Sequence, residues 1–251
     1  MNNYILEIKE IKKTYFFKKQ KIEALKNINL NIFKGEVISL LGVNGAGKTT
    51  LSSIIATLLN QTEGDILYKN KSIYEDITNY RRILGFCPQV QNLDNDLNVI
   101  DNLIFAGRYY GLSKTKITNR VEELLQKFDL KKYEKFNLDQ LSGGYKQRFM
   151  IARTLMHDPT IIIMDEPTVG LDPQLRRLIW KFIMDLREEK KTIILTTHYL
   201  DEADILSDRI CVIHNGSVIA LDSPKILKEN RKSTRLEDVF IELIKEKEDE
   251  K

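Results

Sequence analysis

Residues 42–49 read GVNGAGKT, which matches the spacing G-x-x-x-x-G-K-[ST] of a phosphate-binding loop. The apolar run GEVISLLG leads into the loop, and the helical pattern KTTLSSIIATLLN follows it. Backbone N–H groups of such a loop surround nucleotide phosphates, an adjacent lysine adds positive charge, and a threonine adds an oxygen ligand for Mg²⁺. The alternative is an ordinary glycine-rich turn. The predicted contacts are Gly42, Val43, Asn44, Gly45, Ala46, Gly47, Lys48, Thr49 and Thr50.

Two adjacent carboxylates, Asp165 and Glu166, end the apolar run IIIMDEP. Open α/β sheets bind their ligands at the carboxyl ends of the strands. We therefore expect Asp165 to hold Mg²⁺ and Glu166 to orient or deprotonate an attacking water. Without the phosphate loop, the same pair would be interpreted as an acidic loop after a strand.

Two more polar residues follow predicted strands. His198 comes after ILTT, where it can donate to a γ-phosphate oxygen. Gln89, in FCPQ, is predicted to bring its amide to Mg²⁺ or to the attacking water. His157 and His214 have no comparable context and are assigned no role.

Residues 141–148 read LSGGYKQR, with Ser142 and two glycines at a predicted helix start. Each glycine costs a helix roughly 1 kcal/mol relative to alanine, so another benefit is expected at this position. Exposed N–H groups at a helix N-terminus bind anions. The segment therefore predicts a second anion site, far along the chain from the first.

The intervening patterns predict an α/β fold. Alternation in the first 35 residues indicates half-buried antiparallel strands, and the runs TIIIMD and KTIILTT indicate parallel strands buried on both faces. Between residues 97 and 158 the apolar period becomes 3.6, which predicts a helical subdomain of about residues 90–158.

We assign residues 1–222 to one domain and residues 223–251 to a C-terminal helix with a charged tail. RICVIHNGSVIAL is predicted to be a hairpin.

Composition narrows the classes of function. The 251 residues are 42% hydrophobic and carry a net charge of +3, from 39 basic and 36 acidic side chains, which gives no electrostatic case for nucleic acid. No signal peptide is apparent, and no apolar run approaches the ~20 residues of a membrane span. Cys87 and Cys211 lie in apolar runs and are interpreted as reduced core residues of a cytoplasmic protein.

Together the motifs resemble the nucleotide-binding subunit of an ATP-binding cassette (ABC) transporter, over about residues 4–222. GVNGAGKTT is similar to the family's Walker A, IIIMDE to its Walker B, LSGGYKQR to its signature and GLDP at 170–173 to its D-loop. Gln89 is similar to the Q-loop glutamine and His198 to the switch histidine. The resemblance implies a P-loop NTPase (RecA-like) core with an N-terminal antiparallel β-subdomain, using ATP and Mg²⁺. It also implies that Tyr15 stacks on adenine, although the adjacent Phe16 can take that place.

The resemblance further implies a head-to-tail dimer, with the same chain or with a related cassette. Each ATP would lie between the phosphate loop of one copy and Ser142, Gly143 and Gly144 of the other, with Asp172 at the interface. Two positions depart from the family pattern. Tyr145 replaces the usual glutamine, which leaves its contacts open, and Val43 stands where proline or serine is common.

The segments LNVIDNLIFAGRYYGL and LEDVFIEL resemble exporters of drugs, lipids and polysaccharides, whose membrane permease is a separate chain. The subunit would then sit on the inner face of the cell membrane and meet the permease through residues 90–112. A soluble ABC ATPase acting on ribosomes or DNA is the alternative, but this chain has one cassette and no long heptad run. A P-loop kinase or GTPase is opposed by the signature and by the lack of an NKxD motif.

Overall fold

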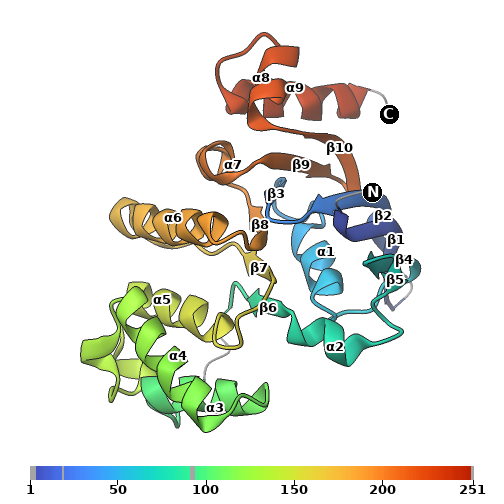
Figure 1. Cartoon of the computed structure of the whole chain (residues 1–251). Helices are drawn as coiled ribbons and strands as arrows, with labels where there is room; N and C mark the ends of the chain where they lie inside the picture. Colours follow the sequence, from blue (N-terminus) through green and yellow to red (C-terminus); the bar gives the residue numbers. More distant parts are fainter. Residues whose placement is uncertain (1–3, 19, 91–93, 250–251) are drawn as a thin grey trace.

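The computed structural model describes residues 4–18, 20–90 and 94–249 (Figure 1). A four-stranded antiparallel sheet occupies one side of the molecule. Its strands, in order across the sheet, are β2 (Gln20–Phe33), β1 (Tyr4–Phe17), β4 (Glu63–Tyr68) and β5 (Lys71–Ser72). Leu6, Ile8, Ile28 and Ile32 are buried, so the predicted alternation of the first two strands is confirmed.

A six-stranded sheet forms the centre. Its strands, in order, are β10 (Ser217–Asp222), β9 (Arg209–His214), β3 (Val37–Leu41), β8 (Thr192–Thr197), β7 (Ile161–Asp165) and β6 (Leu84–Cys87). Every pair from β9 to β6 is parallel, and β10 alone runs antiparallel. The predicted strands TIIIMD and KTIILTT are confirmed as the neighbours β7 and β8, and both are buried throughout. Because they are parallel, Asp165 and Thr197 end at the same edge of the sheet.

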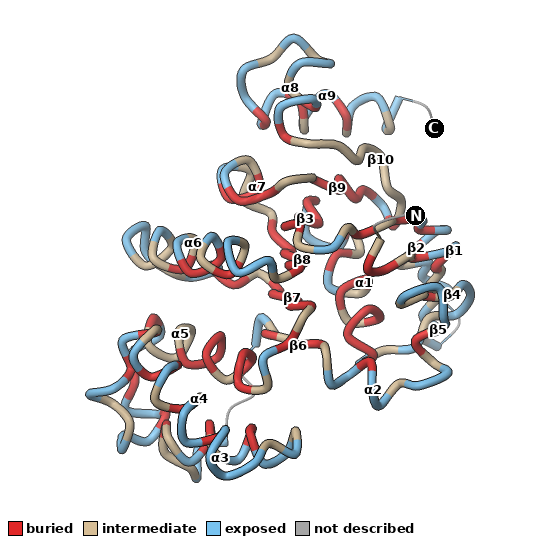
Figure 2. The backbone as a smooth tube through the Cα atoms, in the orientation of Figure 1, coloured by how far each residue is buried: buried red, intermediate tan, exposed pale blue. Residues whose placement is uncertain are grey.

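Strands β9, β3, β8 and β7 are buried almost throughout, as their red colour in Figure 2 shows, whereas the edge strand β10 is half-buried. Ile161 and Ile163 of β7 pack with α1 (Lys48–Ile55) and the antiparallel sheet. The alternate residues Ile162 and Met164 face the helices on the other side.

Most of the helices on that second face lie in the predicted subdomain, and α6 (Pro173–Glu188) also packs there. The helices of the subdomain are α3 (Val99–Tyr109), α4 (Lys114–Lys127), the 3₁₀ turns η1 (Lys131–Tyr133) and η2 (Leu138–Gln140), and α5 (Gly143–Thr154). They lie in the chain between β6 and β7, close to the predicted range of residues 90–158, of which residues 91–93 fall outside the described part.

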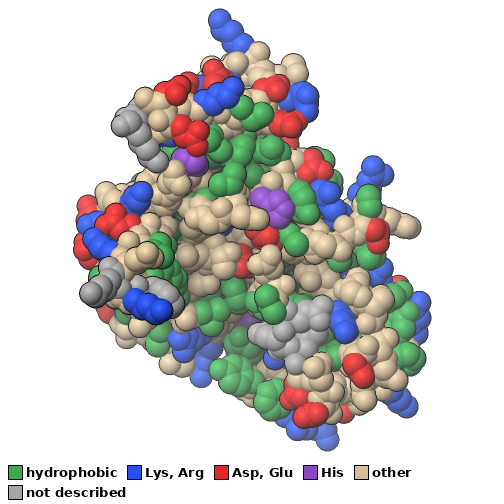
Figure 3. Space-filling view, turned by 180° about the vertical axis from the view of Figure 1, so that it is seen from behind, with side chains coloured by type: hydrophobic (Ala, Val, Ile, Leu, Met, Phe, Trp, Pro, Cys, Tyr) green, Lys and Arg blue, Asp and Glu red, His purple; other side chains and the backbone are tan. Residues whose placement is uncertain are grey.

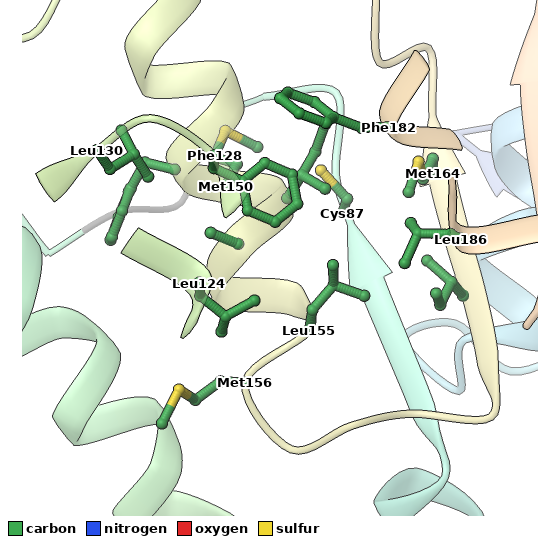
Figure 4. Close-up of a cluster of buried hydrophobic side chains, with 14 of the residues drawn as sticks. Cys87, Leu124, Phe128, Leu130, Met150, Leu155, Met156, Met164, Phe182 and Leu186 are labelled. Carbon is green, nitrogen blue, oxygen red and sulfur yellow. The ribbon is translucent and has the colours of Figure 1, made fainter. Parts of the chain in front are cut away.

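One hydrophobic cluster fixes this subdomain to the sheet (Figure 4). Met150 of α5 and Leu155, the residue that follows this helix, lie in one cluster with Cys87 at the end of β6 and Met164 of β7. Phe128 packs on Phe182 of α6 (Pro173–Glu188), with ring centroids 4.6 Å apart. The cluster therefore sets the position of α5 relative to the strand that ends at Asp165.

One helix end predicted from the sequence is wrong. The helix after the phosphate loop was expected to run through LLN but ends at Ile55, because Thr57 has a left-handed backbone (φ +59°). Arg81 of α2 (Ile77–Arg82), a helix missing from the prediction, donates to the hydroxyl (2.7 Å) and the carbonyl (3.0 Å) of Thr57. The following strand consequently begins at Leu84.

The expected charged tail is helical. After α7 (Leu200–Leu206), the chain forms α8 (Pro224–Asn230) and α9 (Leu236–Asp249), whose Leu236, Val239 and Leu243 are buried. Arg231 binds Glu246 through its Nη2 (2.7 Å), which ties the charged end of α9 to α8. No helix in residues 4–18, 20–90 and 94–249 has the length and hydropathy to cross a membrane.

Candidate nucleotide-binding site

The phosphate loop connects β3 to α1. Gly47 precedes the helix with φ +111°, a conformation that other residues rarely adopt, and a side chain there would meet Ala24 O at 2.8 Å. No acidic residue lies in the first turn of α1, so its N-terminal N–H groups keep their attraction for anions. Val43, Asn44 and Gly45 are exposed. The loop therefore presents backbone to a ligand.

The β9–β10 hairpin supports this loop from behind. Its turn residues Asn215 (φ +47°) and Gly216 (φ +76°) confirm the predicted hairpin turn. The Gly216 N–H donates to Ala46 O at 3.0 Å. A side chain at Gly42 would lie 2.3 Å from Ile213 O, so only glycine fits there without a shift of the backbone.

Lys48 is almost fully buried behind the loop. Its ammonium donates to Gly42 O (2.8 Å) and Val43 O (3.2 Å), and lies 3.5 Å from Glu166 Oε1. Burial lowers the pKa of Lys48, and the Glu166 carboxylate opposes that shift. Two uncharged backbone carbonyl oxygens and one carboxylate hold this ammonium group. A bound phosphate can therefore become a further partner of Lys48 or replace one of these.

Asp165 lies beside Thr49 at the end of β7. Thr49 Oγ1 donates to Asp165 Oδ1 at 3.2 Å, and the Thr196 hydroxyl donates to the same oxygen. Burial raises the pKa of Asp165, against the effect of both hydroxyl donors. A carboxylate and a hydroxyl side by side suit Mg²⁺, which takes few protein ligands and shares the rest with phosphates and water. Among the described residues, no group of three or more His, Cys, Asp or Glu side chains is arranged to hold a metal ion by itself.

Glu166 has a strained backbone at the centre of the site. Its φ of +47° lies in the left-handed region, which costs a non-glycine residue about 1 kcal/mol or more. The Glu166 N–H donates to the carbonyl (3.1 Å) and hydroxyl (2.9 Å) of Thr196 and so holds this conformation. Gln89 Nε2 donates to Glu166 Oε2 at 3.1 Å, and His198 Nδ1 lies 3.3 Å from the same oxygen.

The structure thus brings together six of the predicted residues in one cluster. They are Lys48, Thr49, Gln89, Asp165, Glu166 and His198. Thr196 is a further member that the sequence prediction missed. Its position two residues before His198, on the strand next to that of Asp165, is the signal that identifies it.

The other predicted residues lie elsewhere. No hydrogen bond or ion pair among the described residues joins Ser142, Gly143 or Gly144 to the cluster, and α1 and α5 lie on opposite sides of β6 and β7 (Figure 1). Asp172 caps α6 by accepting from Gln174 N (2.9 Å) and from the next backbone N–H. Tyr15 and the more exposed Phe16 lie on β1.

The two glycines of α5 have different surroundings. A side chain at Gly144 would lie 2.4 Å from Leu175 Cδ1, so this glycine lets α5 pack closely against α6. A side chain at Gly143 would meet nothing within 4 Å. Gly143 is therefore unexplained by the packing of a single chain.

Replacing Gly143 by alanine should leave the fold intact and damage function. The free energy of unfolding should be unchanged or rise by up to about 1 kcal/mol, because alanine favours a helix and has space here. ATP hydrolysis should fall, because the added methyl group obstructs a phosphate approaching the helix N-terminus. Urea unfolding and steady-state ATPase assays measure both. Full activity in Gly143→Ala would show that no ligand approaches this glycine.

Comparison with known proteins identifies the family. The family model described as ABC transporter matches residues 25–169, which is more than half of the chain. The chain belongs to the ABC transporter family. The predicted P-loop fold is therefore confirmed, and the protein is an ATP-hydrolysing cassette of that family.

Individual relatives agree with this assignment. The Nod factor export ATP-binding protein I of Cupriavidus pinatubonensis is 38% identical over 94% of this chain and 71% of its own length. A structure described as an ATP binding subunit of an ABC transporter has a TM-score of 0.85 and 27% identity, covering 96% of this chain and 99% of that one. The ATP-binding cassette MJ0796, in a dimeric post-hydrolysis state bound to ADP and Pi, has a TM-score of 0.80 and 32% identity, covering 87% of this chain and 98% of its own.

Proposed function

We propose that this ABC ATPase drives export through a separate membrane permease and works as a head-to-tail dimer with composite ATP sites. The cluster around Glu166 is the observation that carries the catalytic part, because it places a carboxylate beside the lysine of the phosphate loop. The export relative and the dimeric MJ0796 cassette support the direction of transport and the dimer.

In the proposed dimer, the N-terminus of α5 binds a phosphate of the ATP that the second copy holds. Ser142 is the N-cap residue of α5, yet its side chain makes no capping hydrogen bond, and the first turn contains no acidic residue. Ser142 and Gly143 are both exposed. A γ-phosphate held by the phosphate loop of a second copy would accept from these groups and from the helix N-terminus.

Hydrolysis then follows from the contacts of Glu166. Once phosphate recruits Lys48, the Glu166 carboxylate is free to accept a proton from the attacking water. Gln89 and His198 contact the same carboxylate oxygen, so they hold it in place, and His198 would donate to the γ-phosphate. Thr49 and Asp165 would hold Mg²⁺, which neutralises phosphate charge.

A pocket at the helical subdomain is the proposed permease contact. It has a volume of about 270 Å³ and opens between the end of β6 and helices α3 and α5. Its rim carries the exposed aromatic residues Phe105 and Tyr109, within the predicted contact range of residues 90–112. Hydrophobic side chains also gather over the middle of the face in Figure 3, with many charged side chains near its outline, as in protein contact surfaces.

The experiment is to purify the cassette from membranes with whatever integral protein accompanies it. Phe105→Glu and Tyr109→Glu should abolish the association and leave the basal ATPase rate unchanged, because neither residue touches the Glu166 cluster. Phe136→Glu is the matched control, since Phe136 is an exposed aromatic residue outside the pocket. Co-purification with ribosomes or DNA would instead support a soluble ABC ATPase.

His157 lies in the wall of this pocket and makes stability depend on pH. Its ring stacks on Tyr110 at 3.6 Å, and Nε2 lies 2.9 Å from Leu84 O. Burial lowers the pKa of His157 to about 4. Between pH 6.5 and about 4 the unfolded chain therefore binds a proton that the folded chain does not, so stability falls as the pH falls.

The contribution of His157 to this pH dependence should reach up to about 3 kcal/mol, from 1.36 kcal/mol per pKa unit. His157→Gln should be destabilised near pH 7 but should lose less stability than the wild type on acidification to pH 4. Urea titrations at several pH values give the difference between the two proteins. Parallel curves for both would contradict the assignment.

A further inference from the structure

Glu202 of α7 is fully buried, although it is a carboxylic acid. Its Oε1 accepts two hydrogen bonds, from Thr168 Oγ1 at 2.8 Å and from Trp180 Nε1 at 2.8 Å. Its Oε2 is buried and has no hydrogen-bond partner of good geometry within residues 4–18, 20–90 and 94–249. Burial raises the pKa of Glu202, against the effect of the Thr197 and Thr168 hydroxyls and the Trp180 N–H.

The two donors come from segments that carry the proposed catalytic residues. Thr168 lies two residues after Glu166, in the loop that leads to Asp172. Trp180 lies on α6, whose first turn Asp172 caps. Glu202 itself lies four residues after His198. One carboxyl group therefore joins the segments of the base, the D-loop and the switch histidine.

A second contact joins α6 to the same segment at the surface. Arg176 pairs with Asp201 at 2.9 Å, and its guanidinium lies 4.3 Å from the Tyr199 ring and 5.4 Å from the Trp180 ring. Asp201 in turn accepts from the Glu202 N–H at 2.9 Å. The buried and the exposed contacts therefore fix α7 to α6 on either side of Trp180.

Packing alone does not account for Glu202. A buried carboxyl group with an unpartnered oxygen opposes folding, and an apolar side chain of similar size is often neutral or favourable at such a site. The hydrogen bonds to Thr168 and Trp180 are directional and fix two segments at once. The cost to stability is therefore explained if those bonds serve the reaction.

We propose that Glu202 is a positioning residue for ATP hydrolysis, which holds the Glu166 loop and the His198 segment in one fixed arrangement. This inference rests on the proposed roles of Glu166 and His198. Glu202 makes no contact with the cluster around Glu166. Its replacement should therefore shift the Glu166 carboxylate through the Thr168 loop and leave nucleotide binding unaltered.

The test compares Glu202→Gln with Glu202→Leu in steady-state ATP hydrolysis and thermal unfolding. Glutamine keeps an oxygen that accepts from Thr168 and Trp180, so Glu202→Gln should retain most of the wild-type kcat. Leucine fills the same space without accepting, so its kcat should fall about tenfold or more with the KM for ATP unchanged. Thermal unfolding shows whether each variant is folded at the temperature of the assay.

Thr168→Val removes one donor with little change of volume and guards against a leucine variant that does not fold. It should also lower kcat with the KM unchanged. Wild-type kcat in folded Glu202→Leu or in Thr168→Val would overturn the proposal, as would a loss in Glu202→Gln equal to that in Glu202→Leu. The wild-type protein and Glu166→Gln are assayed in parallel. Unimpaired hydrolysis by Glu166→Gln would instead refute the proposed role of Glu166.

Discussion

Glu166→Gln should bind ATP and hydrolyse it at least about a hundredfold more slowly than the wild type, because general-base catalysis contributes a factor of this order or more. Glutamine has nearly the same shape and still accepts from Gln89, but it cannot take a proton from water. The variant should also accumulate as an ATP-bound dimer, since the step that reopens the dimer is lost. Single-turnover hydrolysis and gel filtration with ATP measure the two effects.

Glu134→Gln provides a matched control for Glu166→Gln. Glu134 is paired with Lys131 at 3.1 Å in the helical subdomain and has no contact with the cluster around Glu166. Its replacement should leave hydrolysis and the oligomeric state unchanged. If Glu166→Gln turned over ATP at the rate of this control, another group would have to be the base.

A mixture of Ser142→Arg and Lys48→Ala chains should recover activity that neither variant has alone. In a head-to-tail dimer, the mixed pair places both substitutions in one composite site and leaves the other site intact. Random pairing of equal amounts makes half of the dimers mixed, each with one working site. The mixture should therefore reach about a quarter of the wild-type rate if the sites act independently.

The recovery depends on exchange of subunits, so mixed dimers are first isolated with two different affinity tags. Ser142→Ala is the milder control, because Ser142 is exposed and its side chain makes no capping bond in the single chain. Isolated mixed dimers without activity would contradict independent sites completed in trans. If the ATPase activity of the mixture came from chains that stay monomeric, the proposed dimer would be contradicted.

The sequence predicts the central sheet well because its signals are local. The runs that became β7 and β8 are continuous and β-branched, which only a strand buried on both faces explains. The error in the end of α1 lies where a distant residue takes part. Thr57, just beyond Ile55, is bound by Arg81 of a later helix, and no local pattern contains this contact.

The residues of the candidate site also form two groups, those that the sequence predicts and those that it does not. Lys48, Asp165 and Glu166 belong to motifs whose spacing carries their chemistry, so they are predictable from sequence. Thr196 and Glu202 are not, because their roles come from parallel pairing and from burial between α6 and α7. The proposed partner of Ser142 lies in a second molecule, and no pattern within one chain can reveal a contact between two copies.

The contact between Lys48 and Glu166 bears on the end of the reaction cycle. In the single chain the ammonium lies 3.5 Å from the carboxylate, so the protein itself supplies an anion for this cation. As inorganic phosphate leaves, Glu166 should compete with it for Lys48, and this competition should lower the affinity for the product. The carboxylate that we propose as the base for water would then also hasten product release, and a glutamine at position 166 would lose both effects together.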